Sequence, residues 1–535
     1  MKFQFQVMTG YAYGSQQPAV ILHATDMPDL PTKLTANLAS LIAHMPPSEV
    51  EHASNHGDAG LNDDDTLTRL VQALDYITLD CGDLRLTPVL WSKNGSAFQC
   101  FFPTLSPQLA VWVFQVLVQN LENRDDPMSE ETQDEFLKQI KKKSRHLLPS
   151  GSNARSLIQS AAERKMPFHV LDNRHLIFGY GAGARLMSSS MTDRESAIGV
   201  RLARSKALTN RFLGMSGFPV TKQVTVNDID DIKRFTKHNG FPVVLKPADS
   251  EQGQGIHTYI TTDEEAEATL KTLQKSYRNI VLERHYHGDG YRITVLDDEA
   301  VWVRKLSPAH VIGDGTSTVE TLVSKENENP ARSAVGSILK KLVIDDTMTS
   351  LVRKQGYTLD AVPEAGTRIV LSPTSNVSRG GTSEDFGDRL HPENRKLCID
   401  VTNSMHLECT GVDMISEDLS RPWYENGAVI CEINAQPQIG LLGRIDVHDM
   451  LIDRLNVRQI PITLEILGDA SEDKTPLFDR SKDRLHLKIS ARRILLMGCP
   501  VQYFDDVIYA PDVAEADRKR VAAILQSVPI EDRAA

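Results

Sequence analysis

The residues whose types and spacing best suit chemistry end a short apolar run at 429–435, which reads Val-Ile-Cys-Glu-Ile-Asn-Ala. The β-branched start predicts a buried strand, and side chains alternate between the two faces of a strand. Glu432 and Asn434 would project from one face, where two hard oxygen ligands suit Mg²⁺ that holds nucleotide phosphates. A preceding apolar run at 411–415 could pair antiparallel and add Asp413. A solvated strand end is the alternative interpretation.

A second set of candidates surrounds a predicted strand at 241–247, which reads Phe-Pro-Val-Val-Leu-Lys-Pro. Lys246 stands at its end, and the next loop contains Gly253 and Gly255. Glycines let backbone N–H groups close round phosphate oxygens, and a lysine adds a point charge beside them. A Gly-x-Gly alone is typical of turns. A strand, a lysine, a glycine loop and a second strand, at 258–261, together favour a phosphate site.

Two further elements frame this loop. A helix over 262–277 is followed by a strand over 280–283 that ends in Glu283, and such a strand edge can pair an adenine with backbone groups. Upstream, a long helix over 195–212 carries Lys206, a second candidate cation for phosphates.

Two arginines stand on a predicted hairpin formed by 291–295 and 300–304. A three-residue turn would place Arg292 directly opposite Arg304, where like charges destabilise the pair unless an anion lies between them. A two-residue turn would place them on opposite faces. The sequence leaves this choice open, and both arginines can reach a phosphate from either register.

Composition excludes several classes of protein. The 535 residues suffice for two to four domains, and 41% hydrophobic against 24% charged residues is ordinary for a globular chain. A formal charge of -12 argues against nucleic-acid or membrane partners, since either needs a basic surface. The six cysteines show no zinc spacing. With no signal-peptide pattern at the start, a soluble cytoplasmic protein is expected.

The N-terminal part, residues 1–150, mixes strand and helix patterns without a catalytic motif. Strands are predicted at 3–7 and 19–23, an apolar helix at 110–121, and a second helix at 129–143 whose acidic start and basic end complement the helix dipole. This region is interpreted as an α+β accessory or substrate-docking domain.

Together these residues resemble an ATP-grasp ligase, and more closely the ATP-grasp half of cyanophycin synthetase. The resemblance rests on the segments Phe-Gly-Tyr-Gly at 178–181, Lys-Ala-Leu-Thr-Asn at 206–210, Pro-Ala-His-Val-Ile-Gly-Asp-Gly at 308–315, Asn-Val-Ser-Arg-Gly-Gly-Thr at 376–382, His-Pro-Glu-Asn at 391–394, Gly-Val-Asp at 411–413 and Glu-Ile-Asn-Ala at 432–435. They follow the family's order over nearly half of the chain.

The resemblance implies a multidomain α+β and α/β chain: an accessory domain at 1–150, an ATP-grasp domain at 151–460 with a lid at 217–286, and a short C-terminal appendage at 461–535. It implies ATP and two Mg²⁺ ions as cofactors. It also implies a role for each candidate: nucleotide binding by Lys206, Lys246, Gly253, Gly255 and Glu283; metal binding by Asp413, Glu432 and Asn434; catalysis by Arg292 and Arg304; substrate binding by Asn376, Ser378, Arg379, Gly380 and Gly381.

Several positions depart from the family's pattern. Arg379 stands where a threonine is usual, Ala331 where an arginine is usual, Gly290 near a usual aspartate, and Gln438 in place of a glycine. In cyanophycin synthetase an Ile-Pro-Ile leads into a second, Mur-ligase-like unit with a P-loop, whereas here no GxxxxGK[ST] occurs. The tail is expected to be a packing or oligomer-forming appendage, with a strand at 493–497 and a helix at 513–526.

The implied activity joins an amino acid to the carboxylate of an amino acid or peptide through an acyl phosphate, with one kind of amide bond formed. The expected partners are these small molecules, with no nucleic acid or membrane, in a homo-oligomer. Two alternatives stay open: a free amino-acid or dipeptide ligase of the glutathione-synthetase kind, and a non-catalytic ATP-binding subunit.

Overall fold

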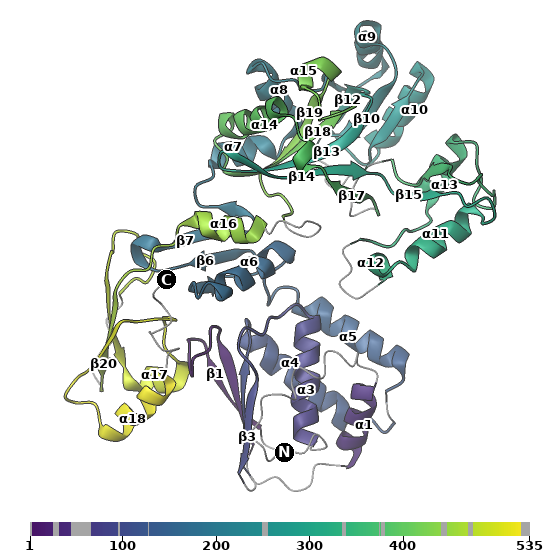
Figure 1. Cartoon of the computed structure of the whole chain (residues 1–535). Helices are drawn as coiled ribbons and strands as arrows, with labels where there is room; N and C mark the ends of the chain where they lie inside the picture. The colour runs from purple at the N-terminus through teal and green to yellow at the C-terminus, as the bar shows by residue number, and fades with distance from the viewer. Residues whose placement is uncertain are drawn as a thin grey trace. The chain divides into compact units, whose positions relative to one another are not determined.

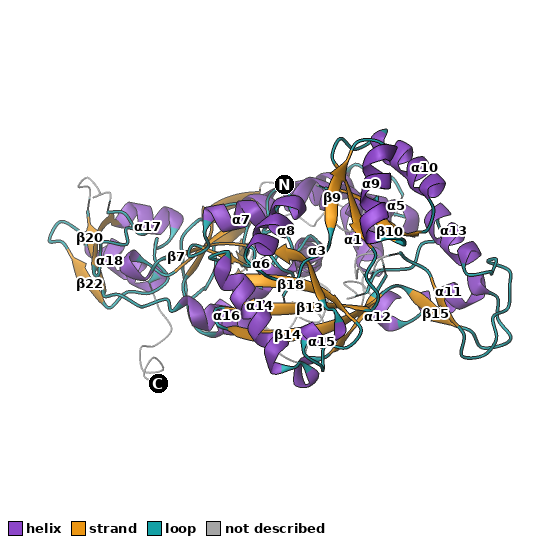
Figure 2. Cartoon of the chain, turned by 90° about the horizontal axis from the view of Figure 1, so that it is seen from above, coloured by secondary structure: helices purple, strands orange, loops and turns teal. Residues whose placement is uncertain are grey.

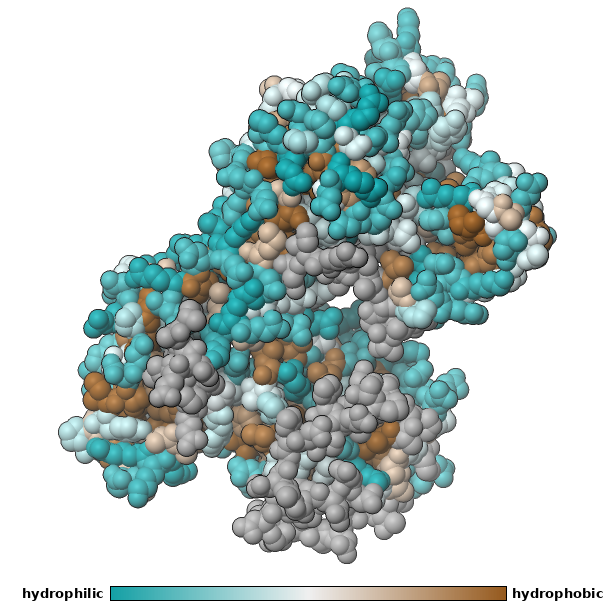
Figure 3. Space-filling view, in the orientation of Figure 1, coloured by the Kyte–Doolittle hydropathy of each residue, from teal (hydrophilic) through white to brown (hydrophobic). Residues whose placement is uncertain are grey.

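A computed structural model describes residues 3–24, 32–43, 66–94, 97–126, 128–248, 255–333, 339–373, 375, 380–439, 447–468 and 475–525. The chain forms two compact units (Figure 1). Unit 1 combines Met1–Ser189 with His448–Ala535, and unit 2 is Ser190–Val447. These limits differ from the predicted boundaries after 150 and 460, which stay predictions for functional domains. The surface visible in Figure 3 is mostly hydrophilic, with scattered apolar patches.

Unit 1 begins with an antiparallel sheet covered by helices. The sheet has the order β1-β2-β4-β3, formed by β1 (Phe3–Met8), β2 (Ala19–Ala24), β4 (Ala97–Pro103) and β3 (Leu90–Asn94). The helices of this region are α1 (Thr32–Ala43), α3 (Thr66–Asp80), α4 (Pro107–Glu122), α5 (Glu130–Ser144) and α6 (Ser152–Glu163), of which α3 and α4 pack on the sheet. The predicted strands and helices of this region are confirmed, and Ser129 caps α5 as its acidic start suggests.

The C-terminal segment packs into the same unit. Its sheet is parallel with the order β21-β20-β22, formed by β20 (Ile462–Leu467), β21 (Leu485–Ser490) and β22 (Asp506–Tyr509). Its helices are α16 (Val447–Leu455), α17 (Ala491–Met497) and α18 (Glu515–Ile524). Met8, Ile21 and Phe101 share one apolar core with side chains of this sheet such as Leu464 and Ile489. The tail therefore completes the core of the N-terminal part.

The strand predicted at 493–497 is wrong, because these residues form α17. A short apolar run carries no periodicity that separates a strand from a buried helix. Ser490 accepts a hydrogen bond from the Arg493 amide and so caps the helix start, and Gly498 ends it in the left-handed region. The helix predicted at 513–526 is confirmed in its central part as α18.

A small antiparallel sheet links the two parts of unit 1. Its strands within this unit are β5 (Phe168–Val170), β6 (His175–Phe178) and β7 (Arg185–Ser188), with a 3-10 turn at Gly181–Gly183 before β7. A Cβ added at Gly183 would collide with the carbonyl oxygen of Arg458. The Phe-Gly-Tyr-Gly segment thus carries a packing role in this chain, since its glycines permit close approach to residues 457–460.

Unit 2 contains a small sheet with its own core, called the lid sheet because it lies within residues 217–286, whose role as a lid stays a prediction. The order is β11-β10-β12-β9, formed by β9 (Gln223–Val226), β10 (Val243–Pro247), β11 (His257–Ile260) and β12 (Ile280–Arg284). Helices α9 (Ile229–Asn239) and α10 (Asp263–Gln274) pack on it, as Figures 1 and 2 show. The predicted strand and its lysine, followed by a second strand, are present in this order.

The larger sheet of unit 2 has the order β17-β14-β13-β18-β19 and is antiparallel throughout. Its strands are β13 (Asp289–Leu296), β14 (Glu299–Ser307), β17 (Thr382–Asp385), β18 (Cys409–Ser416) and β19 (Val429–Asn434). Helices α7 (Ala197–Ala203), α8 (Lys206–Met215) and α14 (Pro392–Ser404) contribute to its core, and α15 (Trp423–Asn426) precedes β19.

The long helix predicted at 195–212 is wrong in one respect, because the structure divides it into α7 and α8. The Ser205 hydroxyl accepts a hydrogen bond from the Leu208 amide and starts a new helix at Lys206. Lys206 therefore stands in a first helical turn rather than in the middle of a helix.

A helical lobe with a separate core is inserted between β14 and β17. It contains β15 (His310–Ile312), β16 (Arg368–Val370), α11 (Val319–Asn327), α12 (Pro330–Ser333) and α13 (Asp346–Lys354). Among the described helices of both units, none combines the length and apolarity that crossing a membrane requires.

Candidate active site

The lid sheet positions a buried ion pair between two predicted nucleotide-binding residues. Lys246 pairs with Val281 across β10 and β12, and Glu283 pairs with Val244, so the two side chains are diagonal neighbours on one face. Lys246 Nζ lies 2.5 Å from Glu283 Oε2, and the residues are 7% and 6% exposed. Burial acts to lower the pKa of Lys246, but the Glu283 carboxylate outweighs it and the pKa is raised.

Two residues to which the sequence assigned no role support the Glu283 carboxylate: Thr221 directly, and Asn210, the last residue of the segment 206–210, through Thr221. The Thr221 hydroxyl donates to Glu283 Oε1 at 2.6 Å, and the Asn210 side-chain amide donates to the Thr221 hydroxyl at 3.1 Å. Asn210 is on α8, the helix that begins with Lys206. No local sequence pattern predicts Thr221, because it meets Glu283 only through the fold.

Lys206 contacts a residue of the predicted metal site rather than the Lys246–Glu283 ion pair of the lid sheet. Its Nζ lies 3.3 Å from Glu432 Oε1, with side chains that are 16% and 33% exposed. The start of α8 thus brings a cation to the end of β19, and the partly exposed carboxylate remains accessible to a ligand.

A row of charged residues crosses all five strands of the larger sheet in register. Directly paired positions place Asp385, Arg304, Arg292, Asp413 and Glu432 side by side from β17 to β19. Directly opposite residues of antiparallel strands share a face. Two cations therefore stand between an acid at one edge and two acids at the other.

Arg292 is tied firmly to Asp413. Its Nε and Nη2 donate to the two carboxylate oxygens at 2.7 and 2.6 Å, a bidentate pair. The charge of Asp413 raises the pKa of Arg292 well above its usual range, against the effect of burial. The side-chain amide of Asn434 also donates to Asp413 Oδ2, at 3.2 Å.

Arg304 is a buried cation with no ion-pair partner among the described residues. It is 5% exposed, and its Nε has no hydrogen-bond partner in the same part of the chain. Its guanidinium lies over the Trp302 ring, 4.0 Å from the centroid. Burial, and then the charge of Arg292, lower the pKa of Arg304 to about 10. A buried cation of this kind indicates a place for an anionic ligand. Trp302, two residues before Arg304, was missed, although the strand period places both on one face.

The predicted metal ligands come together as oxygen donors. Asp413 pairs directly with Glu432, which confirms the antiparallel pairing of their strands, and Asn434 reaches Asp413. Carboxylate and amide oxygens on one sheet edge fit the donor set of Mg²⁺. Among the described residues, no group of three or more His, Cys, Asp or Glu side chains is placed to hold a metal. Metal binding by these residues stays a prediction.

The two predicted glycine loops are described only in part. Gly253 lies outside the described residues, as do Asn376, Ser378 and Arg379. Gly255 and the buried Gly380 and Gly381 are described. Gly380 has a φ of 84°, and a Cβ there would collide with the Leu342 side chain, which accounts for glycine at this position. The substrate role of this loop stays a prediction.

The comparisons with known proteins agree with this arrangement. Residues 372–455 match the RimK-like ATP-grasp domain. The chain is 39% identical over 290 residues to a cyanophycin synthetase of Nostoc sp., a match that covers 54% of this chain and 32% of the relative. It is 28% identical over 291 residues to the glutathione biosynthesis bifunctional protein GshAB of Desulfotalea psychrophila, a match that covers 53% of this chain and 37% of the relative.

A longer match extends the relation beyond unit 2. The cyanophycin synthetase of Crocosphaera subtropica is 27% identical over 432 residues, which covers 78% of this chain and 49% of the relative. A match of this length cannot lie within Ser190–Val447 alone, so part of unit 1 is related as well. The chain spans between a third and a half of the length of these curated relatives. Residues 372–455 are therefore similar to a RimK-like ATP-grasp domain, and about half of the chain is homologous to cyanophycin synthetases.

Proposed function

We propose that the chain is an ATP-dependent, ADP-forming ligase that joins a carboxylate to an amine. The observation that carries this proposal is the buried Arg304, without an ion pair among the described residues, beside the Arg292–Asp413 pair and in one row with Glu432. Such a row offers positive charge for a developing anion next to oxygen donors for a phosphate-bound cation. The homology to cyanophycin synthetases and to GshAB supports the same class of reaction.

ATP would bind between the lid sheet and the larger sheet of unit 2. Lys246 and Lys206 would neutralise phosphate charge, the backbone of the 249–255 loop would donate to phosphate oxygens, and the strand end at Glu283 would meet the adenine. Glu432, Asp413 and Asn434 would hold Mg²⁺. ATP-grasp ligases use this ion in general; that two ions bind is part of the proposal. When bound, Mg²⁺ would neutralise phosphate charge as a Lewis acid.

The reaction would proceed in two steps that leave no covalent link to the protein. A substrate carboxylate oxygen attacks the γ-phosphorus of ATP, the bond to the bridging oxygen breaks, and an acyl phosphate and ADP form. An amine then attacks the acyl carbon, and the tetrahedral intermediate expels inorganic phosphate. Arg304 would donate to the oxyanion, since its guanidinium has no ion-pair partner among the described residues. Arg292 would keep Asp413 in place through their bidentate pair. Its positive charge would also reduce the repulsion between the Asp413 and Glu432 carboxylates.

The substrates proposed are an amino acid as the amine, and an amino acid or peptide as the carboxylate, with the loop 376–381 in contact with them. Relatives named for cyanophycin and for glutathione synthesis both support amino-acid chemistry. The relation to GshAB, a protein named for glutathione biosynthesis, favours, as second candidate, a ligase of free amino acids or dipeptides. We propose that this chain forms a single kind of amide bond, because its described residues after 461 form a small parallel sheet that completes the core of unit 1, and the given sequence contains no GxxxxGK[ST] for a second nucleotide site.

The experiment is a screen for phosphate release by the purified chain with ATP and Mg²⁺, over a panel of amino acids and short peptides, followed by mass spectrometry of the product. The proposal expects one phosphate per amide and an unbranched product. A product with an amino acid joined to a side-chain carboxylate would contradict the single-bond proposal. If no combination of amino acids and peptides gives turnover while ATP still binds, the non-catalytic alternative is favoured.

A further inference from the structure

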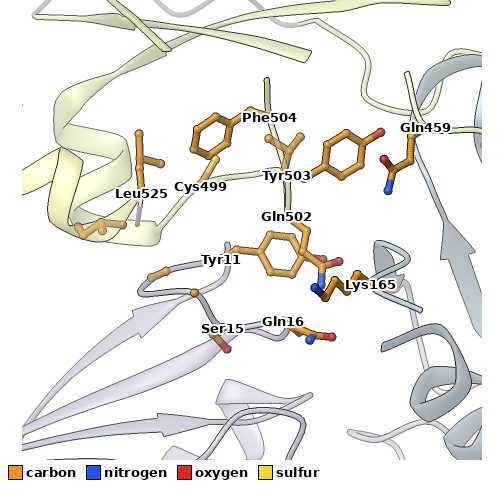
Figure 4. Close-up of a pocket in the computed structure, with 14 residues that line it drawn as sticks. Tyr11, Ser15, Gln16, Lys165, Gln459, Cys499, Gln502, Tyr503, Phe504 and Leu525 are labelled. Atoms are coloured by element: carbon orange, nitrogen blue, oxygen red, sulfur yellow. The ribbon is translucent and has the colours of Figure 1, made fainter. Parts of the chain in front are cut away.

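Unit 1 contains a pocket that the proposed ligase chemistry does not use. It encloses about 710 Å³ of space, counted to its open mouth. Its walls come from the loop 11–16, the segment 499–504 and the end of α18 at Ile524, with Lys165 and Gln459 at the side. Figure 4 shows these side chains gathered from both ends of the chain.

The walls of this pocket are held by the protein itself. Tyr11 and Cys499 exchange backbone hydrogen bonds at 2.7 and 2.8 Å, and the Tyr13 amide donates to the Ile524 carbonyl at 2.9 Å. The Tyr11 hydroxyl donates to the Phe168 carbonyl at 2.6 Å, and the Tyr503 hydroxyl donates to the Ile460 carbonyl at 3.2 Å. These hydroxyls have partners, so the rings serve as apolar walls.

Two carboxamide groups of the pocket are unsatisfied. Gln16 Oε1 and Gln502 Oε1 are both buried, and neither has a hydrogen-bond partner among the described residues. A buried polar atom without a partner costs folding free energy, so its presence at a pocket wall needs an explanation. Rotating either amide by 180° would bury its NH₂ group in place of the oxygen. In either orientation the missing partner has to come from outside the described residues, from a water molecule or from a ligand in the pocket that both side chains line.

The polar, charged and apolar side chains of the pocket lining indicate the chemical groups that a ligand would need. A carboxamide offers a donor and an acceptor side by side, which an amide or peptide group matches with its own acceptor and donor. Lys165 is the single charged residue of the lining and makes no ion pair with the described residues. One lysine matches one carboxylate, whereas nucleotide phosphates would need several cations. Tyr11, Val501 and Leu525 offer apolar surface to an aliphatic side chain.

We propose that this pocket of unit 1 binds a small acyl-amino acid or dipeptide with an apolar side chain and a free carboxylate. The Gln16 and Gln502 amides pair with its peptide group, and Lys165 faces its carboxylate. The site is separate in sequence from every residue assigned to catalysis and does not depend on ligase activity. If the ligase proposal also holds, the pocket binds the chemical class that such an enzyme makes.

The probe is N-acetyl-L-leucine, measured by calorimetry or ligand-observed NMR on the full chain with a non-hydrolysable ATP analogue present. Binding should weaken about tenfold with 4-methylpentanoate, which lacks the amide, and with N-acetyl-L-leucinamide, which lacks the carboxylate, because each loses one set of polar contacts. Binding of AMP at this site in preference to N-acetyl-L-leucine would overturn the proposed ligand class.

Variants separate this pocket from the catalytic site. Gln502→Leu and Gln16→Leu should each weaken binding about tenfold and leave the melting temperature unchanged or higher, since each removes an unsatisfied amide. Gln139→Leu is the matched control, because Gln139 is exposed on α5 away from the pocket lining, and it should bind as the unaltered chain does. Full-strength binding by both folded pocket variants, or loss of binding in Arg304→Met alone, would overturn the proposal.

Discussion

Arg292 and Arg304 lie directly opposite each other on β13 and β14, although only Asp297 and Asp298 separate the two strands. The closing pair is Leu296 with Glu299, which by itself would place the arginines on opposite faces. A β-bulge shifts the register, because Thr294 pairs with Trp302 while Val295 pairs with Ala300. The extra residue, Val301, brings both cations to one face. Two adjacent guanidinium groups repel unless anions lie near them, and Asp413 satisfies Arg292 alone.

Arg304→Met should lower turnover by about 100-fold or more, because it removes a buried charge aimed at a developing oxyanion. Folding stability should change by no more than about 1 kcal/mol, since the lost cation–π contact with Trp302 is offset by removal of a buried charge that makes no ion pair among the described residues. Single-turnover kinetics and urea unfolding measure the two effects. The matched control is Arg389→Gln, an exposed arginine near the same sheet, which should retain turnover. Normal turnover by Arg304→Met would remove this residue from the mechanism.

Glu432→Gln and Asn434→Ala should each abolish most turnover while the fold persists. Both side chains stand on one face at the end of β19, beside Asp413, where losing an oxygen ligand weakens the cation that balances phosphate charge. The dependence of phosphate release on Mg²⁺ concentration, with circular dichroism as the check on folding, tests this. Glu425→Gln, at an exposed acid on α15, serves as the control. An unchanged Mg²⁺ dependence in both site variants would contradict the assignment.

Lys246→Met should destabilise the chain by about 3 to 5 kcal/mol, because it leaves the buried Glu283 carboxylate without its cation. The double variant Lys246→Met with Glu283→Leu should recover much of this loss, since an apolar pair can replace a buried ion pair. Urea unfolding gives the stability of each, and ATP binding should remain weak in both. If the double variant proves no more stable than Lys246→Met, the two losses are independent and the pair is not the cause.

Stability should fall as the pH rises from about 4.5 to about 7 through the ionisation of Glu195. Burial raises the pKa of this carboxyl from 4.5 to about 7, although it accepts a hydrogen bond from the Cys409 amide. The folded state then binds more protons than the unfolded state in this window, so raising the pH favours unfolding.

Glu195→Gln cannot ionise, but its single Oε1 can accept from only one of the amides of Glu408 and Cys409, because these amides donate to different oxygens of Glu195. This loss is the same at every pH, so the stability of the variant relative to the unaltered chain should be higher at pH 8 than near pH 4.5 by about 1 to 2 kcal/mol, after allowance for the partial exposure of the group. Urea midpoints at both pH values measure the difference. An equal offset at both would show that charge is not the cause.

The sequence alone predicted those elements whose local residue pattern agrees with their environment in the fold. The alternation of 429–435 placed Glu432 and Asn434 on one face of β19, and the strand, lysine, loop and strand order identified β10 and β11. Ser129 with its acidic neighbours identified the start of α5. In each case the signal lies within a few residues, because strand period and helix capping are local effects.

Tertiary structure decided what depends on contacts between distant residues. The bulge at Val301 fixed the register of the arginines, and the packing of the lid brought Lys246 to Glu283 and Thr221. The run at 493–497 became α17 because Ile494 is buried while Leu496 is 52% exposed. The described residues after 461 share one apolar core with the N-terminal sheet. Apolar burial is non-directional, so the sequence determined which side chains avoid water, and only the folded chain determined which of them meet.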